Sequence, residues 1–388
     1  MVFNFDLLIQ TLPEGVSLTE YIIKMLAMFA IGGLLIYLAI EKDYEPALLL
    51  PIGLGAILTN IPLTSIVENP KTGEPGIFGV LYDATIANEL FPVLIFIAVG
   101  AMIDFGPLFQ TPSMLFFGAA AQFGIFATMM FALLLGFDLK EAGAIGVIGA
   151  ADGPTTIYVG SAFGLDKGIM GPLTVAAYSY MSLVPIIQPP VIKLLTTKKE
   201  RQIRMNFKQR EVSKLTRILF PIIVTVIAGL IAPESVALIG ALMFGNLIRE
   251  CGVLDSLSKT AQTTLANLVT ILLGITIGTT MTAEKFLTIN TLKIMGMGLL
   301  AFILDTAGGV VFAKILNLFR KEKINPMVGA AGISAFPMSA RVIQKMAREE
   351  DPQNFVLMQS VAANVSGQLG SVVAGSMILV LIGRIVGL

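Results

Sequence analysis

The sequence predicts an all-helical protein that crosses a membrane several times and consists of two repeats. Three observations support this fold class. The 388 residues are 55% hydrophobic and only 13% charged, with a mean hydropathy of +0.84, whereas about a quarter of the residues in a soluble domain are charged. Long apolar segments recur along the chain. Two stretches interrupted by Gly and Pro, residues 146–158 and 329–341, occupy corresponding places in two halves, which is typical of inverted repeats with re-entrant segments.

The first half is a series of apolar segments separated by charges and by Gly or Pro. Residues 1–20 are expected to form an amphipathic or irregular lead without a cleavable signal, because the basic n-region is missing. The first span, residues 21–40, is long enough for a hydrocarbon core of roughly 30 Å. The next apolar segments cover residues 46–63, 91–103 and 114–137. Segment 170–195 contains several prolines and therefore predicts a bent helix.

A basic linker separates the two halves. Residues 198–217 carry eight Lys or Arg side chains against Glu200 and Glu211, so the positive-inside rule places this linker in the cytoplasm. The predicted organisation is a first transmembrane repeat (1–197), the linker (198–217) and a second transmembrane repeat (218–388). The apolar segments of the second repeat cover residues 218–232, 235–248, 265–281, 292–319 and 355–387.

The two interrupted stretches, called the first broken stretch (146–158) and the second broken stretch (329–341), align without a gap. A shift of 183 residues puts Gly146 on Gly329 and Pro154 on Pro337. Asp152 is the single charged residue between positions 142 and 165, and a lone acid in apolar sequence usually marks an ion or substrate pathway. The alternative is that DGP and FP are ordinary turns joining helices. A weaker similarity relates two short segments, VAAY, which ends at Tyr178, and VAAN, which ends at Asn364.

The residue types in and near these stretches favour a hard cation. Carboxylate, carbonyl and hydroxyl oxygens are its usual ligands, and Asp152, Asn325 and Ser334 supply such oxygens, with Thr155, Thr156 and Ser339 as further candidates. Each hydroxyl could instead bond to its own helix, and the asparagine could cap a turn. Asp305 is a second acid in an apolar segment, without an echo in the first half.

Composition also excludes several function classes. The chain has no histidine and one cysteine, Cys251, which removes a histidine-based catalytic triad, an internal disulfide and a cysteine metal cluster. Proton transfer must fall to carboxylates, Tyr, Lys or water, and Tyr178 is one candidate, with packing at a helix interface as the alternative. Arg341 could bind an anionic substrate or lie at a membrane edge. The formal net charge is zero, so nucleic acid is not an expected partner.

Two motifs resemble a known family over nearly the whole chain. GAADGPT with the downstream Tyr178, and NPMVGAAGISAFPMSAR, are similar to the β subunit of the biotin-dependent, sodium-pumping decarboxylases that act on oxaloacetate, methylmalonyl-CoA, glutaconyl-CoA or malonate. The resemblance implies a subunit that decarboxylates carboxybiotin, takes up a proton and exports Na⁺. It implies Asp152, Asn325 and Ser334 as Na⁺ ligands, Gly329 as a backbone contributor, and Tyr178 and Arg341 as catalytic residues, with Arg341 holding carboxybiotin.

The same resemblance implies the setting of the subunit. The expected partners are a carboxyltransferase subunit, a biotin carrier subunit, a small membrane subunit and further copies of this chain. The chain itself is expected to lie in a bacterial or archaeal plasma membrane. Two alternatives stay open on the residues themselves. A secondary Na⁺/H⁺ antiporter or Na⁺-coupled carboxylate transporter would also need an acid among broken helices but no biotin-bearing partner. A membrane scaffold without transport would leave Asp152 unexplained.

Overall fold

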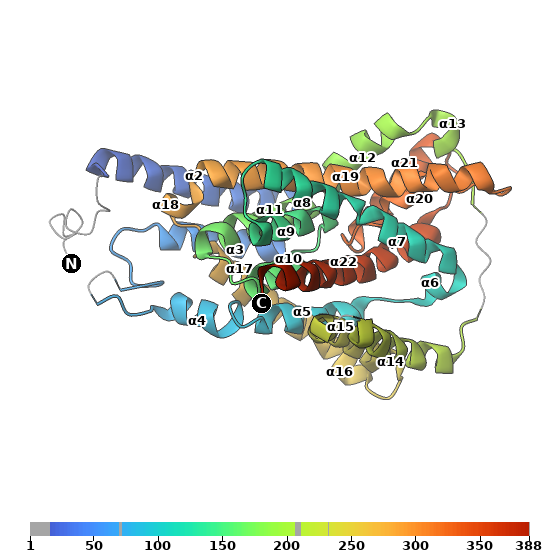
Figure 1. The fold of residues 1–388 in the computed structure, drawn as a ribbon, viewed down its shortest axis with the longest axis horizontal. Coiled ribbons are helices and arrows are strands. Elements are labelled where there is room, and N and C mark those ends of the chain that lie inside the picture. Colours follow the sequence, from blue (N-terminus) through green and yellow to red (C-terminus); the bar gives the residue numbers. More distant parts are fainter. Residues whose placement is uncertain (1–15, 70–71, 206–210, 232, 388) are drawn as a thin grey trace.

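The computed structural model describes residues 16–69, 72–205, 211–231 and 233–387, and these residues are arranged almost entirely as helices (Figure 1). The one β feature in these ranges is an isolated bridge between Glu68 and Pro75. The prediction of an all-helical fold is therefore confirmed. The expected lead, residues 1–20, lies mostly outside the described residues, which begin just before α2 (Leu18–Lys42).

The helices follow the apolar segments closely. Those of the first half are α2 (Leu18–Lys42), α3 (Pro46–Thr59), α4 (Ile77–Thr85), α5 (Leu90–Met102), α6 (Gly106–Gln110), η1 (Pro112–Met114), α7 (Leu115–Ala121), α8 (Phe123–Leu134), α9 (Leu139–Val147), η2 (Ile148–Ala150), α10 (Gly153–Ala162), α11 (Lys167–Ser182) and α12 (Val184–Leu195). Those of the linker and second half are α13 (Lys198–Arg201), α14 (Lys214–Ile231), η3 (Pro233–Ser235), α15 (Val236–Glu250), α16 (Asp255–Thr260), η4 (Ala261–Leu265), α17 (Ala266–Gly278), α18 (Ala283–Phe286), α19 (Ile289–Phe319), α20 (Met327–Ala330), α21 (Met338–Glu350) and α22 (Leu357–Val386).

Five helical segments in the described part of the chain are long and apolar enough to cross a membrane. They are Leu18–Lys42, Pro112–Leu134, Asp255–Gly278, Ile289–Phe319 and Leu357–Val386. The number rises to seven if two bent pairs each form one span, α4 with α5 (62°) and α11 with α12 (69°). The bend between α11 and α12 falls in the proline-rich segment 170–195, where the sequence predicts one. The chain is thus a multi-pass membrane protein.

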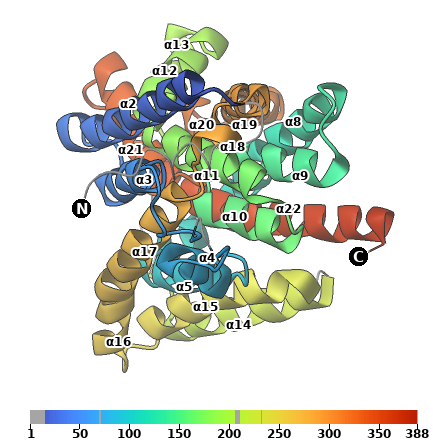
Figure 2. The ribbon, with the colours of Figure 1, turned by 90° about the vertical axis from the view of Figure 1, so that its left-hand side faces the viewer.

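Helices from the two halves pack against each other through glycines. Helix α3 of the first half lies against α17 of the second, and α15 of the second half lies against α5 of the first (Figures 1 and 2). At the first crossing, a Cβ added to Gly55 would come within 2.9 Å of the Gly278 Cα. At the second crossing, a Cβ on Gly100 would collide with the Leu242 carbonyl of α15. Small residues at such crossings let backbones approach closely, as is usual between transmembrane helices.

The outer faces and the centre of the bundle differ in chemistry. Large apolar side chains are exposed on the outer helices, including Ile23, Leu134 and Leu230, at 61%, 82% and 81%. Lipid tails would cover such side chains in a bilayer. In the centre, α10 packs between α11 and α22 (Figure 2). Helix α19 packs against η2 and α20. Both broken stretches therefore lie inside the bundle.

Candidate functional site

The first broken stretch is a helix break that ends in an acidic cap. Helix α9 begins with a capping box between Asp138 and Glu141 and ends in the short 3₁₀ turn η2. Ala151 then adopts a left-handed backbone (φ 53°), an uncommon conformation for a residue with a Cβ. This residue redirects the chain, and Asp152 becomes the N-cap of α10. The isolated acid of the sequence therefore stands at a helix N-terminus inside the protein.

Asp152 is buried and receives hydrogen bonds only from uncharged groups. Its Oδ1 accepts from the Thr155 amide at 3.2 Å. Its Oδ2 accepts from three side chains: Thr155 Oγ1 at 2.7 Å, Gln368 Nε2 at 3.0 Å and Ser371 Oγ at 2.7 Å. Among the described residues, no Lys or Arg side chain forms an ion pair with Asp152. A buried carboxylate without a fixed counter-charge suits a mobile cation, because unpaired buried charge is costly.

Two of these donors come from α22, which the sequence argument did not connect to the site. Gln368 and Ser371 follow Asn364 at helical spacing, i, i+4 and i+7, so the three side chains share one face of this mainly apolar helix. Asn364 donates to the Ile333 carbonyl of the second broken stretch at 2.6 Å, and its Oδ1 is buried without a hydrogen-bond partner in the described structure. A polar stripe on a membrane helix was the signal in the sequence that could have identified them.

Tyr178 lies directly beside the Asp152 cap. A Cβ added to Gly153, the first residue of α10, would collide with the Tyr178 ring, so the glycine makes room for the phenol. The Tyr178 hydroxyl is buried and has no hydrogen-bond partner among the described residues. A buried hydroxyl without a partner is unusual in a native protein and points to a ligand or to a functional role.

The second broken stretch meets the first through its backbone. The Ser334 amide donates to the Ala150 carbonyl at 2.9 Å, and Ser334 Oγ donates to the Gly367 carbonyl of α22 at 2.9 Å. The two broken stretches, which align with each other in sequence, therefore contact each other in the fold. Ser334 is buried, as is Asp152. Asp152, Tyr178 and Ser334 therefore belong to one buried region where the two stretches and α22 converge.

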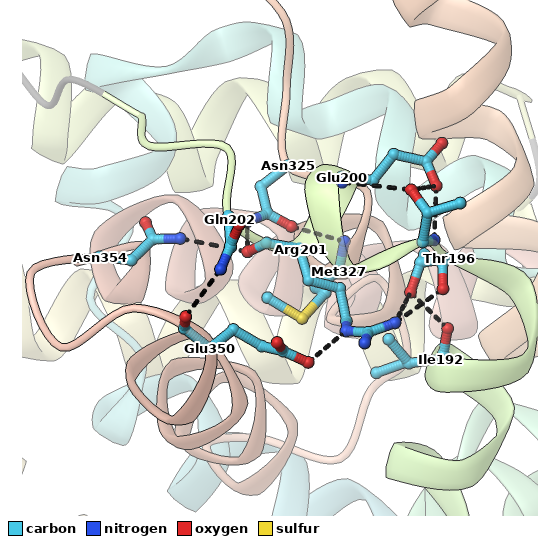
Figure 3. Close-up of polar contacts among 10 residues, drawn as sticks. Ile192, Thr196, Glu200, Arg201, Gln202, Asn325, Met327, Glu350 and Asn354 are labelled. Atoms are coloured by element: carbon cyan, nitrogen blue, oxygen red, sulfur yellow. Dashed lines mark hydrogen bonds and ion pairs between the residues drawn. The ribbon is translucent and has the colours of Figure 1, made fainter.

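Asn325 and Gly329 have other neighbours in this structure. The Asn325 side chain donates to the carbonyls of Arg201 and Ile203 at 2.8 Å and 2.9 Å, and its Oδ1 accepts from the Met327 amide (Figure 3). The asparagine thus ties the linker to the start of α20. Gly329 packs against Gly309 of α19, and a Cβ on either glycine would collide with the carbonyl of the other.

Arg341 lies on the exposed face of α21, the helix that leaves the second broken stretch. It lines a cleft of about 540 Å³ together with Lys345 and Arg348. The Arg341 side chain forms no hydrogen bond or ion pair with another described residue, although its backbone amide donates to the Pro337 carbonyl at 3.4 Å. Its guanidinium is therefore free to bind an anion bidentately. The described residues contain no group of three or more His, Cys, Asp or Glu side chains suited to a resident metal.

Comparison with known proteins adds an independent finding. A family model described as "Na+-transporting oxaloacetate decarboxylase beta subunit" matches residues 24–382. The chain is 48% identical to the methylmalonyl-CoA decarboxylase subunit beta of Propionigenium modestum, covering 92% of this chain and 94% of that protein. It is 49% identical to the glutaconyl-CoA decarboxylase subunit beta of Acidaminococcus fermentans, covering 92% of each. It is 42% identical to the oxaloacetate decarboxylase beta chain 2 of Salmonella typhi, covering 96% of this chain and 98% of that protein.

Proposed function

The chain belongs to the family of Na⁺-transporting oxaloacetate decarboxylase β subunits, and on this basis we propose that Asp152 binds the transported Na⁺ and that Arg341 binds carboxybiotin. Family membership confirms the expectation of a membrane subunit of a sodium-pumping decarboxylase. It also favours this function over a secondary antiporter that acts without decarboxylation.

The observation that carries the proposal is the set of donors around Asp152. Each donor group also carries an oxygen, Oγ1 of Thr155, Oγ of Ser371 and Oε1 of Gln368, which can turn toward a cation. A Na⁺ arriving at Asp152 would therefore meet one carboxylate and several neutral oxygens, the ligand set that hard cations prefer. Ser334 adds a hydroxyl oxygen from the second broken stretch, which touches the first at Ala150.

Asn325 and Gly329 have a supporting place in this proposal. Asn325 holds the linker through two carbonyls, and Gly329 allows α20 to approach α19. Both fix the start of the second broken stretch, so their substitution would move Ser334. We assign them as positioning residues in this conformation, and either could supply an oxygen to Na⁺ only after the stretch rearranges.

The chemical step needs a proton for the biotin nitrogen. When the N–COO⁻ bond of carboxybiotin breaks, CO₂ leaves, and the nitrogen takes up one proton. Tyr178 is the proposed donor because its hydroxyl is buried, unpartnered and adjacent to the Asp152 cap. A cation arriving beside the phenol electrostatically favours loss of its proton. Na⁺ entry and proton delivery would in this way be coupled through one small region.

We also propose that the two halves are diverged repeats (1–197 and 218–388, joined by the linker 198–217). Paired hydrogen bonds support this. Asn60 at the end of α3 donates to the Met281 carbonyl just after α17, at 2.8 Å. Asn246 of α15 donates to the Ile103 carbonyl just after α5, at 3.0 Å. The donors are 186 residues apart and the acceptors 178, close to the 183-residue offset of the broken stretches. Each half thus donates an asparagine side-chain hydrogen bond to a backbone carbonyl of the other half at a corresponding position, as expected of inverted repeats.

The proposed pump requires other subunits. The relatives are themselves named as β subunits or β chains. A carboxyltransferase subunit, a biotin carrier subunit and a small membrane subunit complete the proposed assembly, together with further copies of this chain. This chain meets the acyl substrate only through carboxybiotin, so the choice among oxaloacetate, methylmalonyl-CoA, glutaconyl-CoA and malonate rests with the carboxyltransferase.

The decisive test uses the purified subunits, with this chain reconstituted in liposomes, and free carboxybiotin. We expect CO₂ release that requires Na⁺ and that is accompanied by movement of ²²Na⁺ across the membrane. Equal CO₂ release with and without Na⁺ would refute the assignment of Asp152 as a coupling site. Na⁺/H⁺ exchange in liposomes that lack any biotin compound would instead support the antiporter.

A further inference from the structure

Helix α21 carries a row of basic side chains on its exposed face. Its opposite face packs into the protein through buried Ile343, Met346 and Ala347. Arg341, Lys345 and Arg348 follow one another at i, i+4 and i+7, so they project from one side of the helix, and all three are exposed. We call these three side chains the basic stripe. Glu349, also exposed, is the acid nearest to it along the helix.

Glu350 and Asp351, two of the three acids at the end of α21, do not neutralise the basic stripe, because the linker already holds them. Arg201 Nε donates to the Glu350 carboxylate at 2.6 Å, and Gln202 donates to the Glu350 carbonyl at 3.0 Å (Figure 3). Arg204 binds Asp351 through two nitrogens, at 2.6 Å and 3.0 Å. Within the described ranges, no member of the basic stripe has an ion-pair partner.

The rest of the structure leaves the basic stripe open on one side. Arg348 lies over the Phe355 ring, 5.9 Å from its centroid, and this contact leaves the positive charge uncompensated. The three basic side chains line the 540 Å³ cleft, and its lining also includes one acid, Glu349, and Leu357 at the start of α22. Helix α21, which carries these basic side chains, lies with α13 and α20 at one end of the bundle and contacts both (Figure 1). With three basic side chains and one acid, the cleft is an exposed hollow of net positive charge beside the end of the second broken stretch.

We propose that Lys345 and Arg348 dock an acidic protein surface, that of the partner domain which presents carboxylated biotin, while Arg341 receives the carboxylate itself. This inference rests on the proposed function and adds the partner to it. Complementary charge around a binding cleft raises association rates by about 10–10³-fold and weakens as salt increases. A charged row beside the residue that binds the substrate would bring a tethered substrate to it without contacting its reacting atoms. Lys345 and Arg348 therefore act on the encounter with the partner.

The test compares one substrate in two forms, free carboxybiotin and carboxybiotin on the biotin-bearing subunit that copurifies with the chain. The variant is Lys345→Glu with Arg348→Glu in the full chain. We expect KM for the carrier-bound form to rise roughly 10–100-fold, with kcat unchanged and KM for free carboxybiotin within about twofold of wild type. Wild-type KM for the carrier-bound form should rise with ionic strength, and that of the variant should not.

Three controls make the result unambiguous. Arg320→Glu with Lys321→Glu makes the same charge change on the exposed segment after α19, which does not line the cleft, and should leave both KM values unchanged. Lys345→Arg with Arg348→Lys should behave as wild type. If the reversed charges destabilise the helix, Lys345→Gln with Arg348→Gln should give a smaller rise for the carrier-bound form alone.

Several results would overturn the inference. Equal KM changes for both substrate forms would mean that the basic stripe belongs to the substrate pocket, and no change in either would mean that it is an ordinary solvated face. An effect that disappears in nanodiscs of neutral phosphatidylcholine would identify anionic lipid as the ligand. Wild-type protein that releases no CO₂ from free carboxybiotin would instead contradict the proposed function, so the two failures are distinguishable.

Discussion

Asp152, in the first broken stretch, and Asp305, which packs against that stretch at Gly149, are both buried, yet different kinds of group donate hydrogen bonds to them. Asp152 Oδ2 receives hydrogen bonds from three side chains, those of Thr155, Gln368 and Ser371. Asp305 Oδ1 receives the backbone amide of Ile125, at the start of α8, at 3.1 Å. Its Oδ2 has no hydrogen-bond partner among the described residues. This oxygen lies so close to η2 that a Cβ added to Gly149 would be only 2.6 Å from it.

The difference indicates two roles. Hydroxyl and amide side chains can rotate and exchange a donated hydrogen bond for an oxygen offered to a cation. A backbone amide at a helix start cannot turn, so a carboxylate bound to it holds two helices together. We infer that the environment of Asp152 can change during a pumping cycle, whereas the hydrogen bond from the Ile125 amide to Asp305 Oδ1 ties α19 to α8. Burial alone does not distinguish a transport site from a structural acid.

The largest expected effect is the contrast between the two amide variants. Asp152→Asn removes the one charge at the proposed Na⁺ site, and we expect Na⁺-dependent decarboxylation to fall by at least about 100-fold, since losing even an outer partner of a metal ligand costs 10–100-fold. Asp305→Asn keeps a group that can accept from Ile125, and we expect turnover within roughly tenfold of wild type. The rate of decarboxylation, measured for each variant at saturating and at limiting Na⁺, checks both expectations.

The comparison requires that both variants insert and fold, which thermal unfolding in detergent would establish. Normal Na⁺ activation of Asp152→Asn would show that the cation binds elsewhere. A complete loss of Na⁺ dependence in folded Asp305→Asn would place the second aspartate on the ion pathway and remove the distinction drawn above.

The next effect uses two tyrosines of α11. Tyr178 lies beside Gly153 in the Asp152 region, whereas the Tyr180 hydroxyl donates to the Met295 carbonyl of α19, the helix of Asp305. Tyr178→Phe deletes only a hydroxyl, and we expect kcat to fall by about 100-fold, the lower range for loss of a general acid, with both substrates still bound. Tyr180→Phe should reduce thermal stability with kcat within about twofold. Equal turnover of both variants across pH would rule out Tyr178 as the proton donor.

A smaller effect tests the donors on α22. Ser371→Ala removes one of the three donors to Asp152 Oδ2, and we expect the apparent affinity for Na⁺ to fall about tenfold, as is usual for residues that orient a metal ligand. Ser376 is buried on the same helix, but its hydroxyl donates to the Val372 carbonyl. Ser376→Ala is therefore the matched control, with unchanged Na⁺ affinity. The donor assignment is wrong if the two alanine variants have the same Na⁺ dependence.

Most of the helices could be predicted from the sequence, because the length of an apolar segment and the Gly or Pro residues that interrupt it are local features of the chain. The expected spans 21–40 and 292–319 correspond to Leu18–Lys42 and Ile289–Phe319. The nine-residue α4 was missed, since so short a helix has no distinct signal, and it is bent by 62° from α5. The span expected at 265–281 begins earlier, at Asp255, because a π-helical turn at 261–265 extends it through a polar segment.

The candidate site could be predicted only in part. Asp152 was evident because a lone charge in apolar sequence has few explanations. Gln368 and Ser371 reach it from more than 200 residues away, and their type alone does not distinguish them from back-bonded helix residues. Asp305 seemed to lack an echo, but the 183-residue offset places it on Gln122, which donates to the Gly332 carbonyl of the second broken stretch, at 3.4 Å. Only packing reveals that pairing.

The smallest expected effect concerns a third aspartate, Asp351, which forms an ion pair with Arg204 at the protein surface. The hydrogen bonds from Arg204 hold the pKa of Asp351 below its usual value of 3.8. A carboxyl whose pKa is lowered by folding stabilises the fold above its unfolded pKa, and this contribution is lost as the pH falls through the lower, folded value. Since the Arg204 side chain is 56% exposed, solvent screens the pair.

We therefore expect Asp351→Asn to lower the melting temperature by less than about 2 °C at pH 7. This difference in melting temperature between variant and wild type should disappear as the pH falls below about 4. Scanning fluorimetry between pH 3 and pH 8 measures this, and Asp43→Asn, at an exposed aspartate without an ion pair among the described residues, is the matched control. Decarboxylation and Na⁺ affinity should stay at wild-type values in both variants. A loss of Na⁺ dependence in Asp351→Asn would mean that the contact between the linker and Asp351 affects the buried carboxylates. The contrast between acids whose hydrogen-bond donors can rotate and acids whose donors are fixed would then have to include this surface acid.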